Sequence, residues 1–338
     1  MKLLSLISLF AVFTLQLKAL EIDIWYGDEQ SFGHLGGHPQ RWVNVLGQVS
    51  PASEIQSLTY SLNNGEAYSL SFKEDNKRMA KDGDFNVEIL RTLLNEGKNQ
   101  VSIIAVDTQG NRTLRSVVVV YHKNEEEWPL PYTIDWSKVG DISEAAQIVD
   151  GKWELTPDGV RSVERYYDRV IAFGDNSWEN YEVQTTVIIH ALTGPKELSN
   201  TTNVTHVAIA TRWPGHDADG NQPTVKWHPL GATAEYRLGK DLTNTRWRVF
   251  DGQRKYHVES ERRRDLEFEK PYHMKHRVQT LPNGLTHYQV KLWAADSEEP
   301  AKWDFERFEP GDLRSGSALL LAHHSDATFG NVTVVPID

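Results

Sequence analysis

Hydrophobic and polar residues alternate in short runs along most of the chain. In ATAEYRL (232–238) and THYQVKLW (286–293), apolar side chains occupy one face of an extended strand and polar side chains occupy the other. Turn signals such as NNGE (63–66) separate the runs. Apart from weak helical character around residues 142–149, no segment shows a strong 3.6-residue repeat. The pattern predicts an all-β protein.

The runs fall into two regions. Over residues 20–122 they follow one another at the spacing expected of a β-sandwich. Residues 123–132, KNEEEWPLPY, combine charges with two prolines and indicate a linker. A second series of strand-like runs fills residues 133–338. Because 338 residues exceed what one typical core needs, we expect two domains with these boundaries.

Several phrases of the sequence resemble known families of β domains. VSIIAVDTQGNRTLRSVVVVY (101–121) resembles the last hairpin of bacterial immunoglobulin-like domains. Three further phrases, at 174–190, 273–303 and 316–337, resemble in this order the opening strand, a hairpin and the closing strands of concanavalin A-like/laminin G-like jelly rolls. The resemblance implies an Ig-like β-sandwich followed by a concanavalin A-like jelly roll. Such jelly rolls host lectins, glycosidases, lyases and adhesion modules, so the site must decide the function.

The N-terminus has the features of a secretory signal peptide. Lys2 precedes an apolar run from Leu3 to Leu15, and Ala19 offers a small residue for cleavage. The run is too short to span a bilayer comfortably, and no later stretch is long or apolar enough to do so. We therefore assign residues 1–19 to a signal peptide and expect a secreted or periplasmic protein without a membrane span. The chain contains no cysteine, so core burial alone must stabilise it.

The charge of the chain narrows the choice of partner. It carries 36 basic and 47 acidic residues, a formal net charge of −11 at pH 7. Such an acidic surface disfavours binding to nucleic acid and to anionic membranes. The 11 Trp residues are plentiful, and in a β protein they either fill cores or form stacking platforms.

Strand alternation places candidate binding residues on common faces. His206 and Arg212 share one face of HVAIATRW, and Glu235 and Arg237 share one face of ATAEYRL. If these rows lie on one concave sheet, they form a cleft suited to an acidic or neutral glycan. The alternative is that the rows are the solvated outer face of a sandwich. For the cleft we expect these substrate-binding residues: Arg212, Trp213, Trp227, Arg237, Trp247 and Lys291.

Three functions remain open for this cleft. The first is recognition of a polysaccharide or other glycan by a lectin-like module. The second is a polysaccharide-degrading enzyme, a lyase more than a hydrolase, in which His206 or Glu235 acts as the general base or acid. The third is a non-catalytic surface or adhesion protein. The sequence contains a single copy of each domain, which disfavours the third function.

Two further segments contain reactive or metal-binding side chains. HHSDATFG (323–330) does not form a Ser-His-Asp triad, because adjacent strand residues point to opposite faces, but one of its histidines is expected to face a sheet surface. Asp217, Asp219 and Asn221 follow a D-x-D-x-N spacing that can direct oxygens at calcium. Gln222 stands where that motif needs Gly, so an Asx-rich turn is the alternative.

Overall fold

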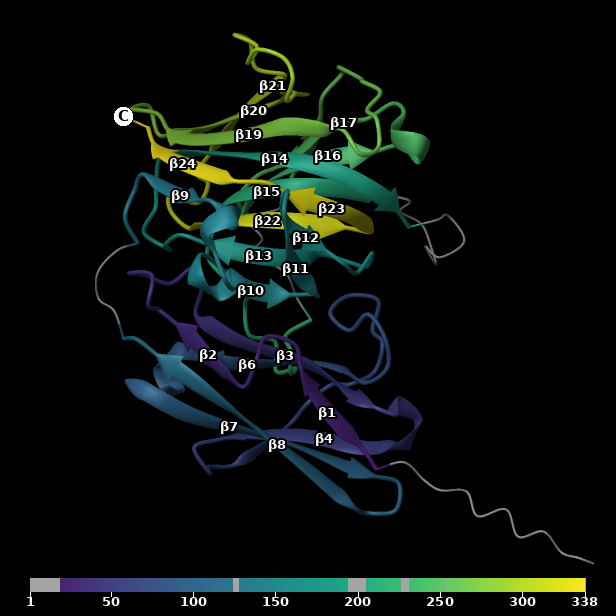
Figure 1. The fold of residues 1–338 in the computed structure, drawn as a ribbon. Helices are drawn as coiled ribbons and strands as arrows, with labels where there is room; N and C mark the ends of the chain where they lie inside the picture. Colours follow the sequence, from purple (N-terminus) through teal and green to yellow (C-terminus); the bar gives the residue numbers. More distant parts are fainter. Residues whose placement is uncertain (1–18, 124–127, 194–204, 226–230, 254, 338) are drawn as a thin grey trace, which may run out of the picture.

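The computed structural model describes residues 19–123, 128–193, 205–225, 231–253 and 255–337. In this part of the chain the protein is all β, as predicted. Figure 1 shows its strands stacked as two β-sandwiches, with β1–β8 at the bottom and β9–β24 at the top. Within the same residues, no helix has the length and apolar character needed to cross a membrane. The helical segments are short 3-10 turns: η1 (Ala52–Glu54), η2 (Arg91–Leu93), η3 (Trp136–Lys138), η4 (Ile142–Glu144) and η5 (Lys240–Leu242).

Strands β1 to β8 form the N-terminal sandwich. Its smaller sheet has the order β1 (Glu21–Ile24), β3 (Trp42–Ser50), β6 (Asp84–Leu90). Its larger sheet has the order β2 (Glu29–Phe32), β8 (Arg112–Tyr121), β7 (Gly97–Asp107), β4 (Ile55–Leu62), β5 (Ala67–Ser69), and β2 pairs with β8 in parallel. Alternating apolar side chains of both sheets fill the space between them, because successive strand residues point to opposite faces. They include Val45, Val87, Ile103 and Val117.

The C-terminal sandwich consists of a seven-stranded and a nine-stranded sheet. The seven-stranded sheet has the order β10 (Gln147–Asp150), β13 (Arg169–Phe173), β22 (Ser317–His323), β15 (Thr205–Trp213), β16 (Ala232–Leu238), β17 (Arg246–Phe250), β18 (His257–Glu259). The nine-stranded sheet has the order β11 (Trp153–Thr156), β12 (Gly159–Ser162), β23 (Ser325–Phe329), β14 (Tyr181–Leu192), β19 (Pro271–Thr280), β20 (Leu285–Ala294), β21 (Phe305–Pro310), with β24 (Val332–Pro336) joining β14 to β9 (Tyr132–Ile134). The main core lies between the two sheets.

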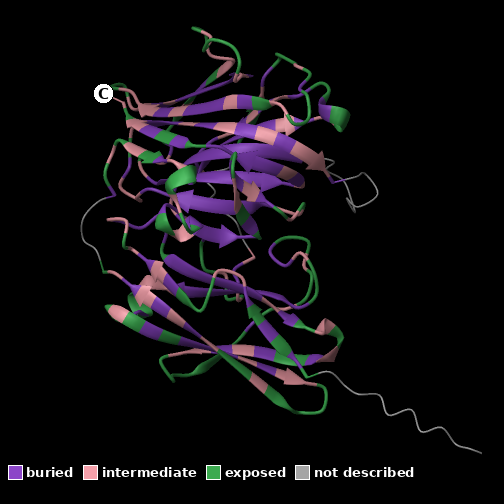
Figure 2. Ribbon diagram, in the orientation of Figure 1, coloured by how far each residue is buried: buried purple, intermediate pink, exposed green. Residues whose placement is uncertain are grey.

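The seven-stranded sheet is also covered on its outer face. Every residue of its central strands β13, β22 and β15 is buried, and Figure 2 shows this region in purple. Ala208, Ala210, Leu319 and Leu321 form a second apolar cluster on this outer face, and Trp213 packs into it. An antiparallel sheet commonly leaves one face in water. In this sheet, other residues of the protein cover that face instead.

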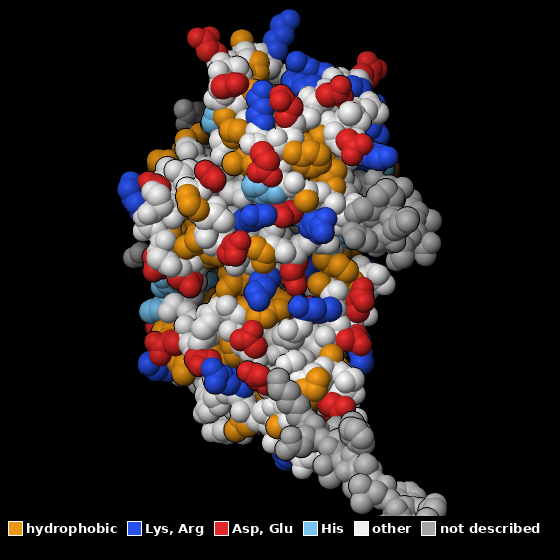
Figure 3. All heavy atoms as spheres, turned by 45° about the vertical axis from the view of Figure 1, so that its right-hand side comes forward, with side chains coloured by type: hydrophobic (Ala, Val, Ile, Leu, Met, Phe, Trp, Pro, Cys, Tyr) orange, Lys and Arg blue, Asp and Glu red, His pale blue; other side chains and the backbone are white. Residues whose placement is uncertain are grey.

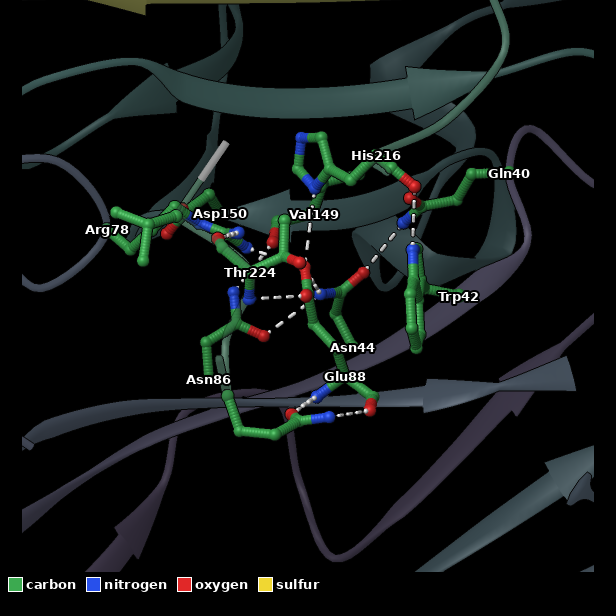
Figure 4. A network of polar contacts seen from close by, with 12 residues as sticks. Gln40, Trp42, Asn44, Arg78, Asn86, Glu88, Val149, Asp150, His216 and Thr224 are labelled. Carbon is green, nitrogen blue, oxygen red and sulfur yellow. Dashed lines mark hydrogen bonds and ion pairs between the residues drawn. The ribbon is translucent and has the colours of Figure 1, made fainter. Parts of the chain in front are cut away.

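A buried polar network joins the two sandwiches (Figure 4). Arg78, in the N-terminal part, pairs with Asp150 of β10 and lies 2.9 Å from Glu88 of β6. His216 Nδ1 lies 3.3 Å from the Glu88 carboxylate, to which the Thr224 backbone N–H also donates at 2.8 Å. Burial would raise the pKa of Glu88, but the charge of Arg78 and the contact with His216 outweigh it and lower that pKa to about 2. The long loop after β15 is therefore anchored to the N-terminal sandwich.

Candidate functional site

A row of ionisable residues crosses the outer face of the seven-stranded sheet. His206 of β15 is the direct partner of Arg237 on one side and of His323 on the other, and Arg237 is the partner of Arg246. Asp168 directly precedes β13, whose register places it opposite His323. Directly opposed residues of an antiparallel pair project from the same face. The ladder thus aligns Asp168, His323, His206, Arg237 and Arg246, which we call the charged row.

A second set of charges lies beside the charged row on β16, β17 and β18. Glu235 is the partner of Arg248, which in turn is the partner of Glu259. Arg248 Nε donates to Glu235 Oε2 at 2.7 Å, and the Glu235 side chain is fully buried. Glu259 accepts from both Arg237 and Arg246, the latter at 2.6 Å. Each guanidinium is held by a carboxylate, so the donors have fixed directions.

The imidazoles at the centre of the charged row are closely packed. His323 Nδ1 lies 2.6 Å from Asp168 Oδ1, and both side chains are buried. The rings of His206 and His323 stack with a centroid distance of 4.4 Å and an interplanar angle of 6°. His206 Nδ1 lies 3.7 Å from Glu235 Oε2. His324, the next residue along the chain, packs edge-on against His323, and burial lowers the pKa of His324 to about 4.

Aromatic residues border the basic end of the row. The ring centroids of Phe250 and His257 are 5.0 Å apart, and the Arg248 guanidinium lies 5.1 Å from the Phe250 ring centroid. Tyr256 in the connection between β17 and β18 is 67% exposed. An exposed aromatic face beside hydrogen-bonding groups is a suitable platform for a sugar ring. On the face drawn in Figure 3, basic and acidic side chains are interspersed, so it carries no large patch of one sign.

The structure brings together three residues that the sequence placed in the cleft, namely His206, Glu235 and Arg237. The sequence reasoning did not include Asp168, Arg246 and Arg248, although RWRVF (246–250) shows the same alternation of basic and apolar positions. Asp168 had no such signal, because it lies just outside a strand and reaches the row only through the register of β13 with β22.

Arg212 lies outside the charged row, contrary to the prediction. The register of β15 and β22 shifts between Ala210 and Trp213, and Arg212 has a positive φ of 53°. This irregularity interrupts the period-two alternation on which the prediction depended. The Arg212 guanidinium donates instead to the carbonyls of Glu179 and Leu313, at 2.8 and 2.6 Å. Arg212 therefore stabilises one end of the sandwich.

Three other predicted binding residues also lie elsewhere. Trp213 is fully buried in the outer apolar cluster, and Trp247 is buried in the main core with its Nε1 donating to Asp304 at 3.2 Å. Neither indole face is open to a sugar. Lys291 belongs to β20 of the nine-stranded sheet and donates to Pro300 O at 3.0 Å. Trp227 falls outside the described residues.

The D-x-D-x-N segment forms a turn. Asp219 Oδ1 accepts from the backbone N–H of Asn221 at 3.0 Å, and Asp219 Oδ2 accepts from the Val225 N–H at 3.0 Å. Asp217 pairs with Arg41 at 3.2 Å. These carboxylates accept from N–H donors, which is the geometry of an Asx-turn. This turn is the alternative that the sequence left open, and the calcium assignment to Asp217, Asp219 and Asn221 stays a prediction.

No family model and no curated protein matches the chain. Similar solved structures include the Ca²⁺-bound VIP36 exoplasmic/lumenal domain, with 14% identity and a TM-score of 0.41 over 61% of this chain and 90% of that chain. The alginate lyase Aly36B has 10% identity and a TM-score of 0.34 over 60% of this chain and 88% of that chain. A carbohydrate-binding module of the β-sandwich superfamily has 8% identity and a TM-score of 0.20 over 95% and 98%. Because all three TM-scores lie below 0.5, the side chains of the site carry the functional inference.

Proposed function

We propose that the protein binds a polysaccharide or other glycan along the outer face of β16, β17 and β18. The observation that carries this proposal is the fixed array of guanidinium and carboxylate groups around Glu259. Arg237 and Arg246 both pair with this carboxylate, and the three side chains remain 21%, 22% and 29% exposed. The array offers donors and an acceptor in set directions at a partly open surface.

The chemistry of this surface matches that of a sugar. Guanidinium groups donate to ring hydroxyls or form bidentate bonds with a uronate carboxylate, while Glu259 accepts from hydroxyls. The partly exposed Phe250 lies beside Arg248 on the same face as Glu259, where its ring can pack against the apolar face of a pyranose. Little side-chain entropy is lost on binding, because neighbouring charges already hold the guanidiniums.

We also propose that the glycan is met outside the cytoplasm, with residues 20–122 acting as a spacer for the glycan-binding unit 133–338. The support for export is the apolar N-terminal segment of residues 1–19. A protein without cysteine needs no oxidising compartment, and the two sandwiches have apolar cores that stabilise them without disulfides.

A polysaccharide lyase is the second candidate function. The contact between Asp168 and His323 favours it, because a buried carboxylate that orients an imidazole is a common arrangement for a general base. In such a reaction the base would remove the proton at C5 of a uronate, the C4–O bond would break, and a double bond would form between C4 and C5. Glu235 suits this role less, since it is fully buried and held by Arg248, and we assign it to positioning that arginine.

Affinity electrophoresis on gels containing single polysaccharides tests the proposal. We expect at least one acidic or neutral polysaccharide to retard the protein, and Arg237→Ala and Arg246→Ala each to weaken the retardation about tenfold or more. Arg115→Ala is the matched control, because Arg115 also forms an ion pair, with Asp28, on the N-terminal sandwich. The proposal would be contradicted if none of the polysaccharides altered the migration of the wild type. Ultraviolet absorbance from an unsaturated product would select the lyase.

A further inference from the structure

We propose that Asp168, His206 and His323 form a binding site for a divalent transition-metal ion of the zinc type. Each residue offers one ligand atom, and these atoms all lie within 4.8 Å of one another. Two imidazoles and one carboxylate are a common ligand set for such ions. The inference does not rest on the proposed glycan function, since it concerns the buried end of the charged row rather than the exposed arginines.

The scaffold of this site is a continuous β ladder. His206 and His323 are direct partners on β15 and β22, and Asp168 stands at the start of β13, the next strand. The side chains of all three are at least nine-tenths buried, so the fold already restricts their conformations. A bound metal ion would therefore cost little additional side-chain entropy. Tetrahedral coordination bonds of about 2.0–2.1 Å place ligand atoms about 3.3 Å apart, so atoms up to 4.8 Å apart must approach one another by up to about 1.5 Å, a movement that side-chain rotation can supply.

The charges around the three residues favour a cation. Asp168 lies at one end of the group, and the carboxylate of Glu235 lies 3.7 Å from His206 Nδ1 at the other. The neighbouring cations are directed to other carboxylates: Arg248 to Glu235, Arg237 to Glu259, and Arg169 to Glu164 and Asp150. The 2.6 Å contact between Asp168 Oδ1 and His323 Nδ1 already holds these two proposed ligands side by side.

The ligand set also selects among metals. Calcium takes six to eight oxygen ligands, and this group supplies two nitrogens and one carboxylate. Zinc accepts imidazole and carboxylate ligands together, and three protein ligands leave a fourth position for water or a substrate oxygen. A bound ion would engage His323, so a zinc-loaded protein could not use the same ring nitrogen as a general base.

Isothermal titration of EDTA-treated, full-length protein with ZnCl2 tests the inference. We expect one Zn²⁺ per chain and no comparable binding of CaCl2. His323→Gln and Asp168→Asn should each weaken zinc binding by about tenfold or more. His287→Gln is the matched control, because His287 pairs with Glu306 on the nine-stranded sheet, and it should bind zinc like the wild type.

Absence of zinc binding, or equal affinity in His323→Gln, Asp168→Asn and wild type, would overturn the assignment. If a variant fails to fold, CoCl2 titration of the wild type still decides the question, because Co²⁺ in a four-coordinate protein site gives intense visible d–d bands whereas nonspecifically bound Co²⁺ stays octahedral and absorbs only weakly. Arg237→Ala separates this inference from the glycan proposal: it should lose retardation by polysaccharide and keep zinc stoichiometry.

Discussion

The two sheets of the C-terminal sandwich both carry ionic pairs on their outer faces, but the surroundings of these pairs differ. On the nine-stranded sheet, Lys291 pairs with Glu299 and His287 with Glu306, and the two glutamates are 41% and 45% exposed. On the seven-stranded sheet, Glu235 pairs with Arg248 and is fully buried. Both faces arise from the same alternation of polar and apolar residues along their strands.

The difference shows that the packing around a sheet, rather than its sequence pattern, decides whether a row of polar side chains is exposed to water or buried. Water reaches the pairs of the nine-stranded sheet and screens them, so each contributes little to stability. On the seven-stranded sheet the Glu235 carboxylate is fully buried, so it needs a partner within the protein, which is Arg248. Groups held in this way have fixed directions, which is what a binding site requires.

The largest effect is expected from breaking the network that anchors the loop after β15. Arg78→Ala removes the cation that pairs with Glu88 and Asp150, and both carboxylates are buried. We expect the free energy of unfolding, measured by urea titration at neutral pH, to fall by about 3–5 kcal/mol. Lys98→Ala, which breaks the exposed pair with Glu29, should have little effect. If the two variants lost equal free energy of unfolding, water would have access to the interdomain network.

A smaller effect is expected from His276 of β19, which lies in the core that both sheets share. Its Nδ1 contacts Ile209 O at 3.1 Å, and burial lowers its pKa to about 4. As pH falls, the unfolded chain takes up this proton near the ordinary histidine pKa of about 6.5, before the folded protein does. Stability should therefore decrease between pH 6.5 and pH 4, by about 2–3 kcal/mol at pH 4.5 from this group.

Urea unfolding of wild type and His276→Met between pH 7 and pH 4.5 measures that contribution. The variant removes the titrating group, so its stability should decrease less than that of the wild type over this range. Parallel pH dependences of the two proteins would mean that water reaches His276 and that the core between the sheets is not closed at this point.

The smallest effect compares the two outer faces directly. Glu235→Gln leaves the Arg248 guanidinium without its buried counter-charge, and we expect a loss of about 2 kcal/mol. Glu299→Gln alters an exposed partner of Lys275 and Lys291 and should cost less than about 1 kcal/mol. Thermal unfolding monitored by circular dichroism measures both. The contrast between the faces would disappear if the two losses were equal.

The sequence predicted the all-β fold and the placement of His206, Glu235 and Arg237 on one face. These features depend on period-two alternation, which is a local property of an extended chain. It also predicted that one histidine of HHSD would face a sheet surface, and His323 does so beside His206. The placement of Arg212 was wrong, because a single irregularity in β15 cancels the alternation beyond Ala210.

The tertiary structure alone decided which faces are covered and which distant residues meet. Whether Trp213 and Trp247 stack on a ligand or fill a core depends on what packs against them, and no strand encodes that locally. Asp168 joins His323 only because β13 and β22, far apart in the sequence, pair in one register. The alternation of a strand fixes the face on which a side chain lies, whereas contacts between separate strands determine its neighbours and its access to water.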